Sequence, residues 1–382
     1  MTIKKTAFLA LSLVLSTSAF AQLSGDGFYR VKNVSTARYI NIIDNTGKVD
    51  YASTYVDLSA LQTVRHFDNV VNNPGTIIYI REEGYYQYSL AAQGTDSKQI
   101  SGEYLQVTPV GDAYQAWASK KGMTVYLSDI EDLEDPDIAT VTQSDANSSK
   151  TTKNWYIIPV KADIDEQYFG IKPEQQVNDT YWATMYAYFP FKTYSEGMTV
   201  YYTDKIANGK VIVKEVTGTV PGQSAVIIKC SSATADGNRI DIVDENVNAI
   251  SNSLLGGVYF CNHNAGHINR REYNPNSMRV LGTTKEGKIG FVKAPESYLS
   301  QGCIPANKAY LKVPTGTADE LEIMTEEEYA EWITGIDNVI LDSTKSNGIY
   351  TLTGVQVRQK GDSTEGLPRG IYVVNGKKVI VQ

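Results

Sequence analysis

The chain has few of the side chains on which catalytic and metal chemistry depends. Its 382 residues include only three cysteines and three histidines. Because three is an odd number, at least one cysteine is unpaired or all are reduced, and a framework of disulfides cannot be the basis of stability. The sequence also lacks a Gly-x-Ser-x-Gly elbow, a His-Glu-x-x-His pair, a Gly-x-Gly-x-x-Gly loop and a phosphate-binding loop. We therefore predict no cofactor and favour a non-enzymatic protein.

Positive charge is also scarce. The chain has 35 basic and 43 acidic residues, which give it a formal charge of −8. Nucleic-acid binding needs clustered Lys and Arg to neutralise phosphates, so the charge balance argues against this function. Beyond the N-terminal segment, no stretch is apolar for the roughly 20 residues that a membrane-spanning helix needs. We therefore expect no integral membrane span once a signal peptide is removed.

Tyrosine and glycine, in contrast, are abundant. The chain has 26 tyrosines and 30 glycines, and it is 42% hydrophobic and 20% charged. This composition can build packed cores, and it is typical of strands and turns rather than helices. The length suggests two or three domains. We therefore predict a mainly β, multidomain protein with few short helices.

The first 21 residues have the three parts of a secretory signal peptide. Lys4 and Lys5 form a basic start, residues 8–15 an apolar run, and Ala19-Phe20-Ala21 a small-x-small cleavage site. A transmembrane anchor is the alternative, but the apolar run is shorter than the roughly 20 residues needed to cross a bilayer. Residues 1–21 are thus expected to direct export through the periplasm and to be cleaved after Ala21, which predicts a secreted or cell-surface protein.

Residues 22–162 repeat one design three times: an aromatic strand, a polar turn and a strand that opens with Tyr and an aliphatic residue. Three such units predict a β-trefoil-like or barrel-like first domain. The segments GFYRVKNVSTARYI (27–40) and NWYIIPV (154–160) resemble the first and last strands of ricin-type β-trefoil lectins. A helix is also expected near 57–64, because Asp57 can cap it and apolar residues follow about one turn apart.

Residues 163–316 are expected to form a β-sandwich-like second domain. In residues 181–191 both the odd-numbered and the even-numbered positions are mainly apolar, which is typical of a strand buried on both faces. Asn208-Gly209 predicts a hairpin. The segment VPGQSAVI (220–227) matches IPANKAYL (304–311), so two related halves are predicted. The domain resembles β-sandwich modules of uncharacterised Bacteroidetes surface proteins, a resemblance that implies no activity.

Residues 317–336 are expected to be a helix and a linker. Thr325 and Glu328 have the spacing of a capping box, and Tyr329, Trp332 and Ile333 would lie on one face of the helix. We expect that face to pack on the second domain.

The last segment, residues 337–382, contains two paired patterns, GIYTLTGVQV (348–357) and LPRGIYVVNGKKV (367–379). Both read as strands joined by Gly-containing turns. In this order and at the terminus, they resemble the C-terminal sorting domain of type IX secretion cargo in Bacteroidetes. The resemblance implies a small C-terminal β-sandwich module that contacts the secretion machinery. An ordinary β-sandwich tail is the alternative.

The sharpest cluster of metal-binding residue types is Cys261, His263 and His267. Thiolate and imidazole are the donors that zinc prefers, and Cys230 or Cys303 could supply a fourth. Two other interpretations remain open. The segment is rich in Asn and Gly and can be a plain polar turn, or Cys261 and His263 can form a nucleophile pair.

Six carboxylates lie between residues 129 and 137, beginning with Asp129. Calcium prefers such oxygen donors, but the segment lacks the glycine and the spacing of an EF-hand. A solvated acidic loop is therefore the favoured interpretation.

Aromatic side chains provide the candidate binding residues. Tyr85, Tyr86, Tyr114 and Trp117 lie among Gln and Ser in the first domain, where we expect them to face a ligand. The features together predict an exported, non-enzymatic cell-surface or secreted protein that binds a glycan or a surface protein. A secreted hydrolase with an unidentified carboxylate pair and a purely structural or adhesive protein are the alternatives.

Overall fold

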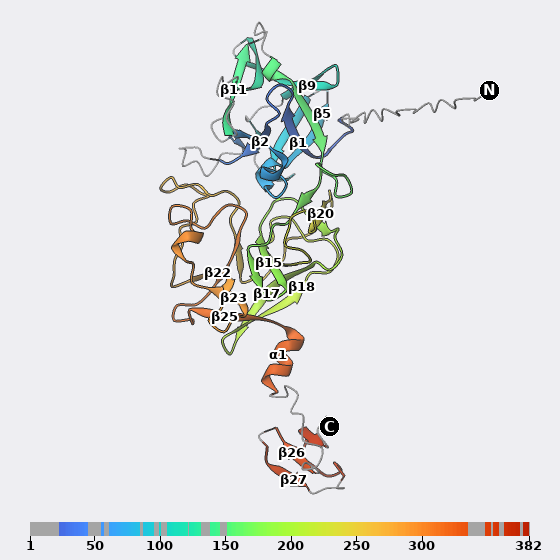
Figure 1. Ribbon diagram of the computed structural model, residues 1–382, viewed down its shortest axis with the longest axis vertical. Helices are drawn as coiled ribbons and strands as arrows, with labels where there is room; N and C mark the ends of the chain where they lie inside the picture. The colour runs from blue at the N-terminus through green and yellow to red at the C-terminus, as the bar shows by residue number, and fades with distance from the viewer. Residues whose placement is uncertain are drawn as a thin grey trace, which may run out of the picture.

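The computed structural model describes residues 23–44, 55–56, 61–84, 87–94, 99–100, 105–120, 122–130, 138–145, 151–334, 348–352, 354–358, 363–374 and 377–381. The protein is mainly β and contains several sheets, as the composition predicts. Two large β domains follow one another along the chain, and α1 (Glu326–Ile333) and a small sheet come after them (Figure 1). The predicted signal peptide, residues 1–21, lies outside the described residues.

The first domain is built on a closed ring of six strands. β1 pairs with β5, β5 with β6, β6 with β8, β8 with β9, β9 with β12, and β12 returns to β1, each time antiparallel. The bounds of these strands are β1 Gly27–Asn33, β5 Ile78–Gly84, β6 Gln87–Ala92, β8 Leu105–Val110, β9 Ala113–Lys120 and β12 Trp155–Pro159. Closure removes the exposed edges that an open sheet would present.

The remaining strands of the first domain extend from this ring. β4 lies between β2 and β11, and β11 pairs with β10, which also continues the hairpin from β9. A six-stranded ring with hairpins added to it is the arrangement of a β-trefoil, so the first domain is β-trefoil-like. The bounds are β2 Tyr39–Ile42, β3 Tyr55–Val56, β4 Leu61–Val64, β7 Gln99–Ile100, β10 Met123–Asp129 and β11 Ile138–Asp145, with short 3-10 turns η2 Phe67–Asn69, η3 Pro74–Thr76 and η4 Thr151–Lys153.

The prediction of a helix near residues 57–64 is wrong for residues 61–64, the part of this segment that the structure describes. Residues 61–64 form β4, with Leu61 and Val64 both buried, while residues 57–60 lie outside the described part. The strand has partners on both sides, β2 and β11, and these ladder hydrogen bonds outweigh the helix-like spacing of the apolar residues.

Apolar side chains from all six ring strands fill the interior of the barrel. The largest of them is Trp155, which is 1% exposed and donates its indole hydrogen to the Leu127 carbonyl at 2.9 Å. The barrel also buries an ion pair. Arg38 Nε lies 2.8 Å from Asp129 Oδ2, and neither side chain is exposed. This pair joins the beginning of β2 to the end of β10, so it fixes the outer hairpins on the ring.

The second domain shows the predicted duplication in its strand pairing. In the first half, β17 pairs with β18 and β19, and β19 with β15; in the second half, β22 pairs with β23 and β24, and β24 with β21. The bounds are β15 Thr180–Met185, β17 Thr199–Ala207, β18 Lys210–Glu215, β19 Val226–Cys230, β21 Leu255–Gly257, β22 Met278–Thr283, β23 Ile289–Val292 and β24 Ala309–Lys312.

Matching turns support the same duplication. Gln223 and Asn307, equivalent positions in the sequence repeat, have φ values of 57° and 59°. Their backbone N–H groups donate to Ala187 O and Val258 O, in each case at 2.7 Å. The repeat predicted from the sequence is therefore confirmed at the level of individual hydrogen bonds.

One strand of the second domain comes from the segment that the sequence assigned to a helix and linker. β25 (Glu320–Thr325) lies between β18 and β23, at the centre of the ten-stranded sheet. The domain thus extends to Thr325 rather than ending at residue 316. The alternating burial of Leu321 and Ile323 marks this strand, but its two neighbours come from distant parts of the chain.

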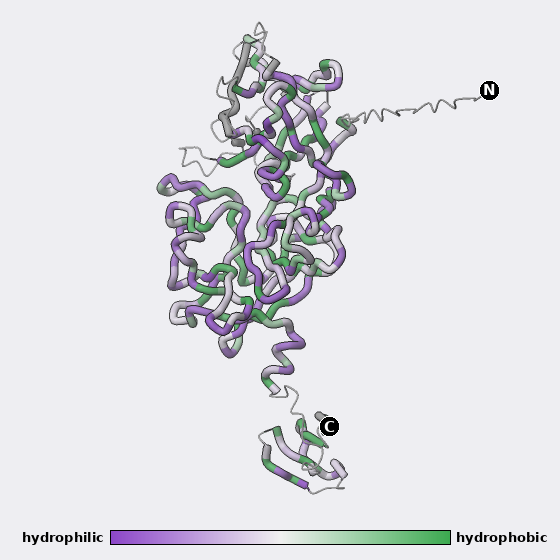
Figure 2. Tube along the Cα trace, viewed as in Figure 1, coloured by the Kyte–Doolittle hydropathy of each residue, from purple (hydrophilic) through white to green (hydrophobic). Residues whose placement is uncertain are grey.

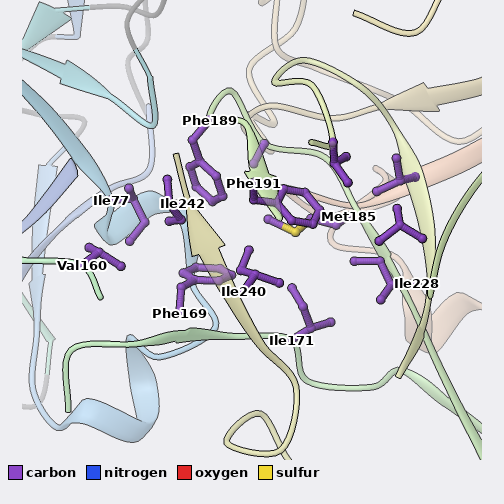
Figure 3. Close-up of a cluster of buried hydrophobic side chains, with 14 of the residues drawn as sticks. Ile77, Val160, Phe169, Ile171, Met185, Phe189, Phe191, Ile228, Ile240 and Ile242 are labelled. Carbon is purple, nitrogen blue, oxygen red and sulfur yellow. The ribbon is translucent and has the colours of Figure 1, made fainter. Parts of the chain in front are cut away.

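A three-stranded sheet covers one face of the first half. It has the order β13–β20–β16, with bounds β13 Phe169–Gly170, β16 Phe191–Thr193 and β20 Arg239–Ile242, and the edge of the large sheet is β14 (Gln175–Val177). Figure 3 shows Phe169, Phe191 and Ile240 facing Met185 and Ile228 across the space between the two sheets. This facing pair of sheets is the sandwich-like part of the domain.

The two large domains share their hydrophobic cores. Tyr259 and Phe260 of the second domain pack into the barrel core, and Ile77 and Val160 of the first domain join the core of the second, as Figure 3 shows. Gly94 lies so close to Tyr188 that an added Cβ would be 2.8 Å from its carbonyl oxygen. The boundary between the domains is therefore closely packed.

The predicted helix is present and has its capping box. Thr325 Oγ1 accepts from the Glu328 N–H, and Glu328 Oε2 accepts from the Thr325 N–H. Tyr329 is buried and accepts a hydrogen bond from Asn208, whereas Trp332 and Ile333 are exposed. Figure 2 shows that most of α1 is hydrophilic. Tyr329 therefore packs on the second domain as expected, and Lys210 of β18 lies 5.0 Å from the centre of the half-exposed Trp332 ring.

The C-terminal segment forms a single four-stranded sheet in its described residues, rather than two facing sheets. The order is β27–β26–β28–β29, with bounds β26 Ile349–Thr351, β27 Gln356–Arg358, β28 Gly370–Val374 and β29 Lys377–Val381. β28 and β29 pair from Val374↔Lys377 outward, in the register of a two-residue hairpin loop. Residues 375–376 and 335–347 lie outside the described part.

Candidate functional site

Trp117 lies on the outer face of the barrel. Its neighbours in β9, Ala116 and Ala118, pack on the barrel core, so the alternation of the strand directs Trp117 outward. Gln106 of β8 and Tyr126 of β10 lie directly across from it in the two ladders. Gln106, Trp117 and Tyr126 thus form a line across three strands, which we call the aromatic row. All three side chains are partly exposed.

Polar groups surround the aromatic row. The indole N–H of Trp117 donates to Thr108 Oγ1 at 3.0 Å, and this bond fixes the orientation of the ring. Lys153 Nζ lies 4.8 Å from the centre of the Tyr126 ring, in a cation–π contact. Gln115 donates to Asn154 at 2.7 Å beside the row. The tips of the adjoining hairpins carry the exposed side chains of Val110 and Met123, 42% and 67% exposed.

This arrangement favours a flat, neutral and polar ligand. Aromatic faces bind the C–H face of a sugar ring, and nearby amides and hydroxyls accept and donate hydrogen bonds to its hydroxyl groups. The row lies on the outer face of the barrel, where its partly exposed side chains offer contact area.

Tyr114, another predicted binding residue, lies elsewhere. Tyr114 points inward: its ring packs on the barrel core, and its hydroxyl accepts a hydrogen bond from the Leu23 N–H at 2.9 Å. It therefore anchors the start of the described chain and is not part of the aromatic row. Tyr85 and Tyr86 lie outside the described residues.

The structure does not assemble the predicted zinc site. Cys261 Sγ lies 3.3 Å from His263 Nε2, and Ser300 Oγ lies 3.2 Å from the same nitrogen. His267, however, is buried and accepts a hydrogen bond from the Asn269 N–H. No group of three His, Cys, Asp or Glu side chains suited to a metal ion occurs in the part of the chain that the structure describes. Of the three main predicted ligands, Cys261 and His263 are brought together, and Cys303, the possible fourth ligand, lies near Cys261.

The nucleophile interpretation of Cys261 is also weakened. Burial raises the pKa of the Cys261 thiol, and the nearby Cys303 thiol raises it further. A cysteine nucleophile requires the opposite shift, because the thiolate is the reactive form. The remaining cysteine, Cys230, is buried in β19, where burial raises the pKa of its thiol to about 12.

Asp129 is a structural residue and not part of a solvated loop. Besides its ion pair with Arg38, it accepts hydrogen bonds from Thr36 Oγ1 and Thr63 Oγ1. Its carboxylate oxygens are thus used within the barrel, and they are not available to a calcium ion. The acidic residues at 131–137 lie outside the described part.

Sequence reasoning missed Gln106, Tyr126 and Lys153. Each is an ordinary strand or turn residue when considered alone, and only the register of β8, β9 and β10 places them beside Trp117. An alternation pattern gives the face of each strand, but it does not give the pairing that aligns three strands.

Within the described residues, no helix combines the length and apolar character needed to cross a membrane. A scan against protein-family models finds no match, and a search of curated proteins finds none either. Among solved structures, the chain is similar to a designed three-fold symmetric protein, ThreeFoil, with 15% sequence identity and a TM-score of 0.25. That match covers 35% of this chain and 99% of the designed protein, and at this TM-score it supports no functional conclusion.

Proposed function

We propose that the protein is an exported, non-enzymatic carbohydrate-binding protein and that its glycan ligand lies on the aromatic row. The outward-facing Trp117 is the observation that carries the proposal. Its indole N–H is bonded to Thr108 and its ring stands beside Tyr126, so a stacking surface is held ready on a rigid barrel. Binding to a fixed aromatic surface avoids the entropy cost of ordering side chains when the ligand arrives.

The resemblance of the first domain to ricin-type lectins supports the same proposal. The segments that carry it, residues 27–40 and 154–160, contain β1 and β12, which pair with each other to close the barrel ring. The β-trefoil-like arrangement fits such a lectin, but the ligand is argued from the aromatic row.

Export is the second part of the proposal. Residues 1–21 would direct the chain through the periplasm, and the C-terminal module at 337–382 would be the part that the type IX secretion machinery contacts. The protein would then act at the exterior of the outer membrane or in the medium. N-terminal sequencing of protein from the native host is expected to begin at Gln22, and a sequence beginning at Met1 would contradict export.

A glycan-array screen of the purified protein tests the binding site. Trp117→Ala is expected to weaken binding of the glycan by roughly ten-fold or more, about 1.4 kcal/mol, because the stacking surface is lost. Trp332→Ala is the matched control, because Trp332 is a 42% exposed tryptophan on α1, away from the barrel. Its binding should equal that of the unmodified protein.

Two outcomes would contradict the proposal. The first is the absence of binding to any glycan, which would favour a protein partner or a structural role. The second is equal binding by Trp117→Ala and Trp332→Ala, which would place the glycan elsewhere. Urea unfolding of Trp117→Ala checks that the barrel is intact.

A further inference from the structure

A cleft of about 350 Å³ lies where the first and second domains meet. Residues 69 and 72–74 of the first domain line one side, and residues 169–172, 184–185 and 306–308 of the second domain line the rest. Binding pockets for small molecules often form at domain boundaries, and this volume lies in the lower part of their usual range. It suits a ligand about the size of a monosaccharide.

The walls of the cleft are held in place by hydrogen bonds. The Gly170 N–H donates to Val71 O at 3.0 Å, which ties the two domains together at the cleft itself. The Asn307 side chain donates to Gln93 Oε1 and Tyr186 O, at 3.1 and 3.0 Å. The cleft is therefore formed before any ligand arrives, and its donors and acceptors have fixed positions.

The charge of the cleft is opposite to that of the chain. The described residues that line it include two lysines, Lys172 and Lys308, and no aspartate or glutamate, whereas the formal charge of the chain is −8. Glu174, which is not among the lining residues, holds Lys308 with an Oε1–Nζ distance of 3.1 Å. The same Oε1 accepts from the Thr184 N–H and hydroxyl. Glu174 therefore holds Lys308 in place and offsets its charge, and Lys172 is the second lysine of the lining.

The rest of the lining suits a ring with both polar and apolar faces. Asn69, Asn72 and Asn73 line the first-domain side, where Asn69 also donates to Arg65 O and Asn73 to Asn41 Oδ1, so each of these two keeps one amide hydrogen for a ligand. Pro74 and Met185 supply apolar surface beside them. A ligand with an anionic group, several hydroxyls and exposed C–H groups would use all three kinds of surface.

We propose that this cleft is a second binding site and that it takes a carboxylated sugar, a hexuronate residue. Lys172 and Lys308 bind the carboxylate, and the asparagine amides bind the ring hydroxyls. The inference rests on the proposed function for one assumption, that the ligand is a glycan. The site itself is separate, because the cleft shares no residue with the aromatic row.

Titration calorimetry at low ionic strength tests the site with the purified protein. Glucuronate and galacturonate are the probes, and glucose, galactose, acetate and sulfate are the comparisons. We expect a hexuronate to bind roughly ten-fold or more tightly than its neutral sugar, and Lys172→Gln to weaken it by about the same factor. Lys192→Gln is the matched control, because this lysine pairs with Glu245 and does not line the cleft.

The inference would be overturned by an absence of hexuronate binding, by equal binding of acidic and neutral sugars, or by unchanged affinity in Lys172→Gln. Sulfate or acetate binding as tightly as the hexuronate would also overturn it, because the site would then recognise charge alone. Trp117→Ala separates the two proposals. It should leave hexuronate affinity unchanged, so that loss of the glycan-array signal and loss of hexuronate binding are independent results.

Discussion

The two halves of the second domain share a strand pattern but differ where they meet the first domain. The turn at Gln223 binds the carbonyl of residue 187, and the turn at Asn307 binds the carbonyl of residue 258. Positions 189 and 260, each two residues further along the chain, therefore correspond to each other. Phe189 packs against Phe169 of its own domain and Phe28 at the boundary. Phe260 instead enters the barrel core of the first domain. The second half thus provides the deeper attachment.

A similar difference appears between Tyr186 and Gly257, which are also equivalent positions, because they come directly before Ala187 and Val258. A Cβ added at Gly257 would lie 2.0 Å from the Tyr186 ring. Two tyrosines could not occupy this place together, so one half supplies the ring and the other supplies the space. The comparison teaches that the duplicated halves keep their backbone hydrogen bonds and diverge in the side chains that meet each other and the barrel.

The largest expected effect tests the attachment through Phe260. Phe260→Ala should destabilise the protein by about 3–5 kcal/mol, because it removes a side chain that is 1% exposed and leaves a cavity in the barrel core. Urea unfolding measures the change. Trp332→Ala, at an exposed aromatic residue, should change stability by only about 0.5 kcal/mol. If Phe260→Ala proved as stable as this control, the barrel would not depend on the second domain.

Local features of the fold were predictable because neighbouring residues decide them. Asn208-Gly209 forms its hairpin loop, with Ala207↔Lys210 as the closing pair, and positive φ at both residues explains the choice of Asn and Gly. The capping box at Thr325 and Glu328 is likewise set within one turn of helix. The repeat around Pro221 and Pro305 was visible because both halves kept the same turn.

Features that depend on distant pairing could not be predicted. β25 takes its place between β18 and β23 only because the duplicated halves leave a gap between them. The sequence predicts Trp117 as a binding residue but does not place Tyr126 beside it, because the register of β9 and β10 is fixed by the whole barrel. Tyr114 was assigned to the ligand although strand alternation turns it toward the core. Composition cannot distinguish these two aromatic environments.

A medium effect tests the matching turns. Gln223 is exposed and has φ of 57°, so Gln223→Gly relieves left-handed strain and should stabilise the protein by about 0.5 kcal/mol. Asn307 has the same conformation, but its side chain holds Gln93 and Tyr186 at the domain boundary. Asn307→Gly should therefore destabilise by about 1–2 kcal/mol. Equal effects in urea unfolding would mean that the two halves contribute alike at the boundary.

The last prediction concerns alkaline pH. Burial, with help from a hydrogen bond to Tyr188, raises the pKa of Tyr186 from 10.0 to about 12, and burial raises that of Cys230 from 9.0 to about 12. In the unfolded chain both groups lose their protons at lower pH, so the folded state binds more protons and stability falls as the pH rises. The stabilisation should be complete below about pH 9 and decline toward about pH 12.

Tyr186→Phe isolates the tyrosine's share of this decline, because it keeps the ring and removes the ionisable hydroxyl. Its free energy of unfolding, measured by urea at a series of pH values, should fall less steeply than that of the unmodified protein above about pH 10. Tyr194→Phe, at a tyrosine that is 52% exposed, is the control and should leave the slope unchanged. If Tyr186→Phe keeps the original slope, the ring that fills the space beside Gly257 is hydrated in the folded state. This result would contradict the conclusion that the two halves pack closely at Tyr186 and Gly257.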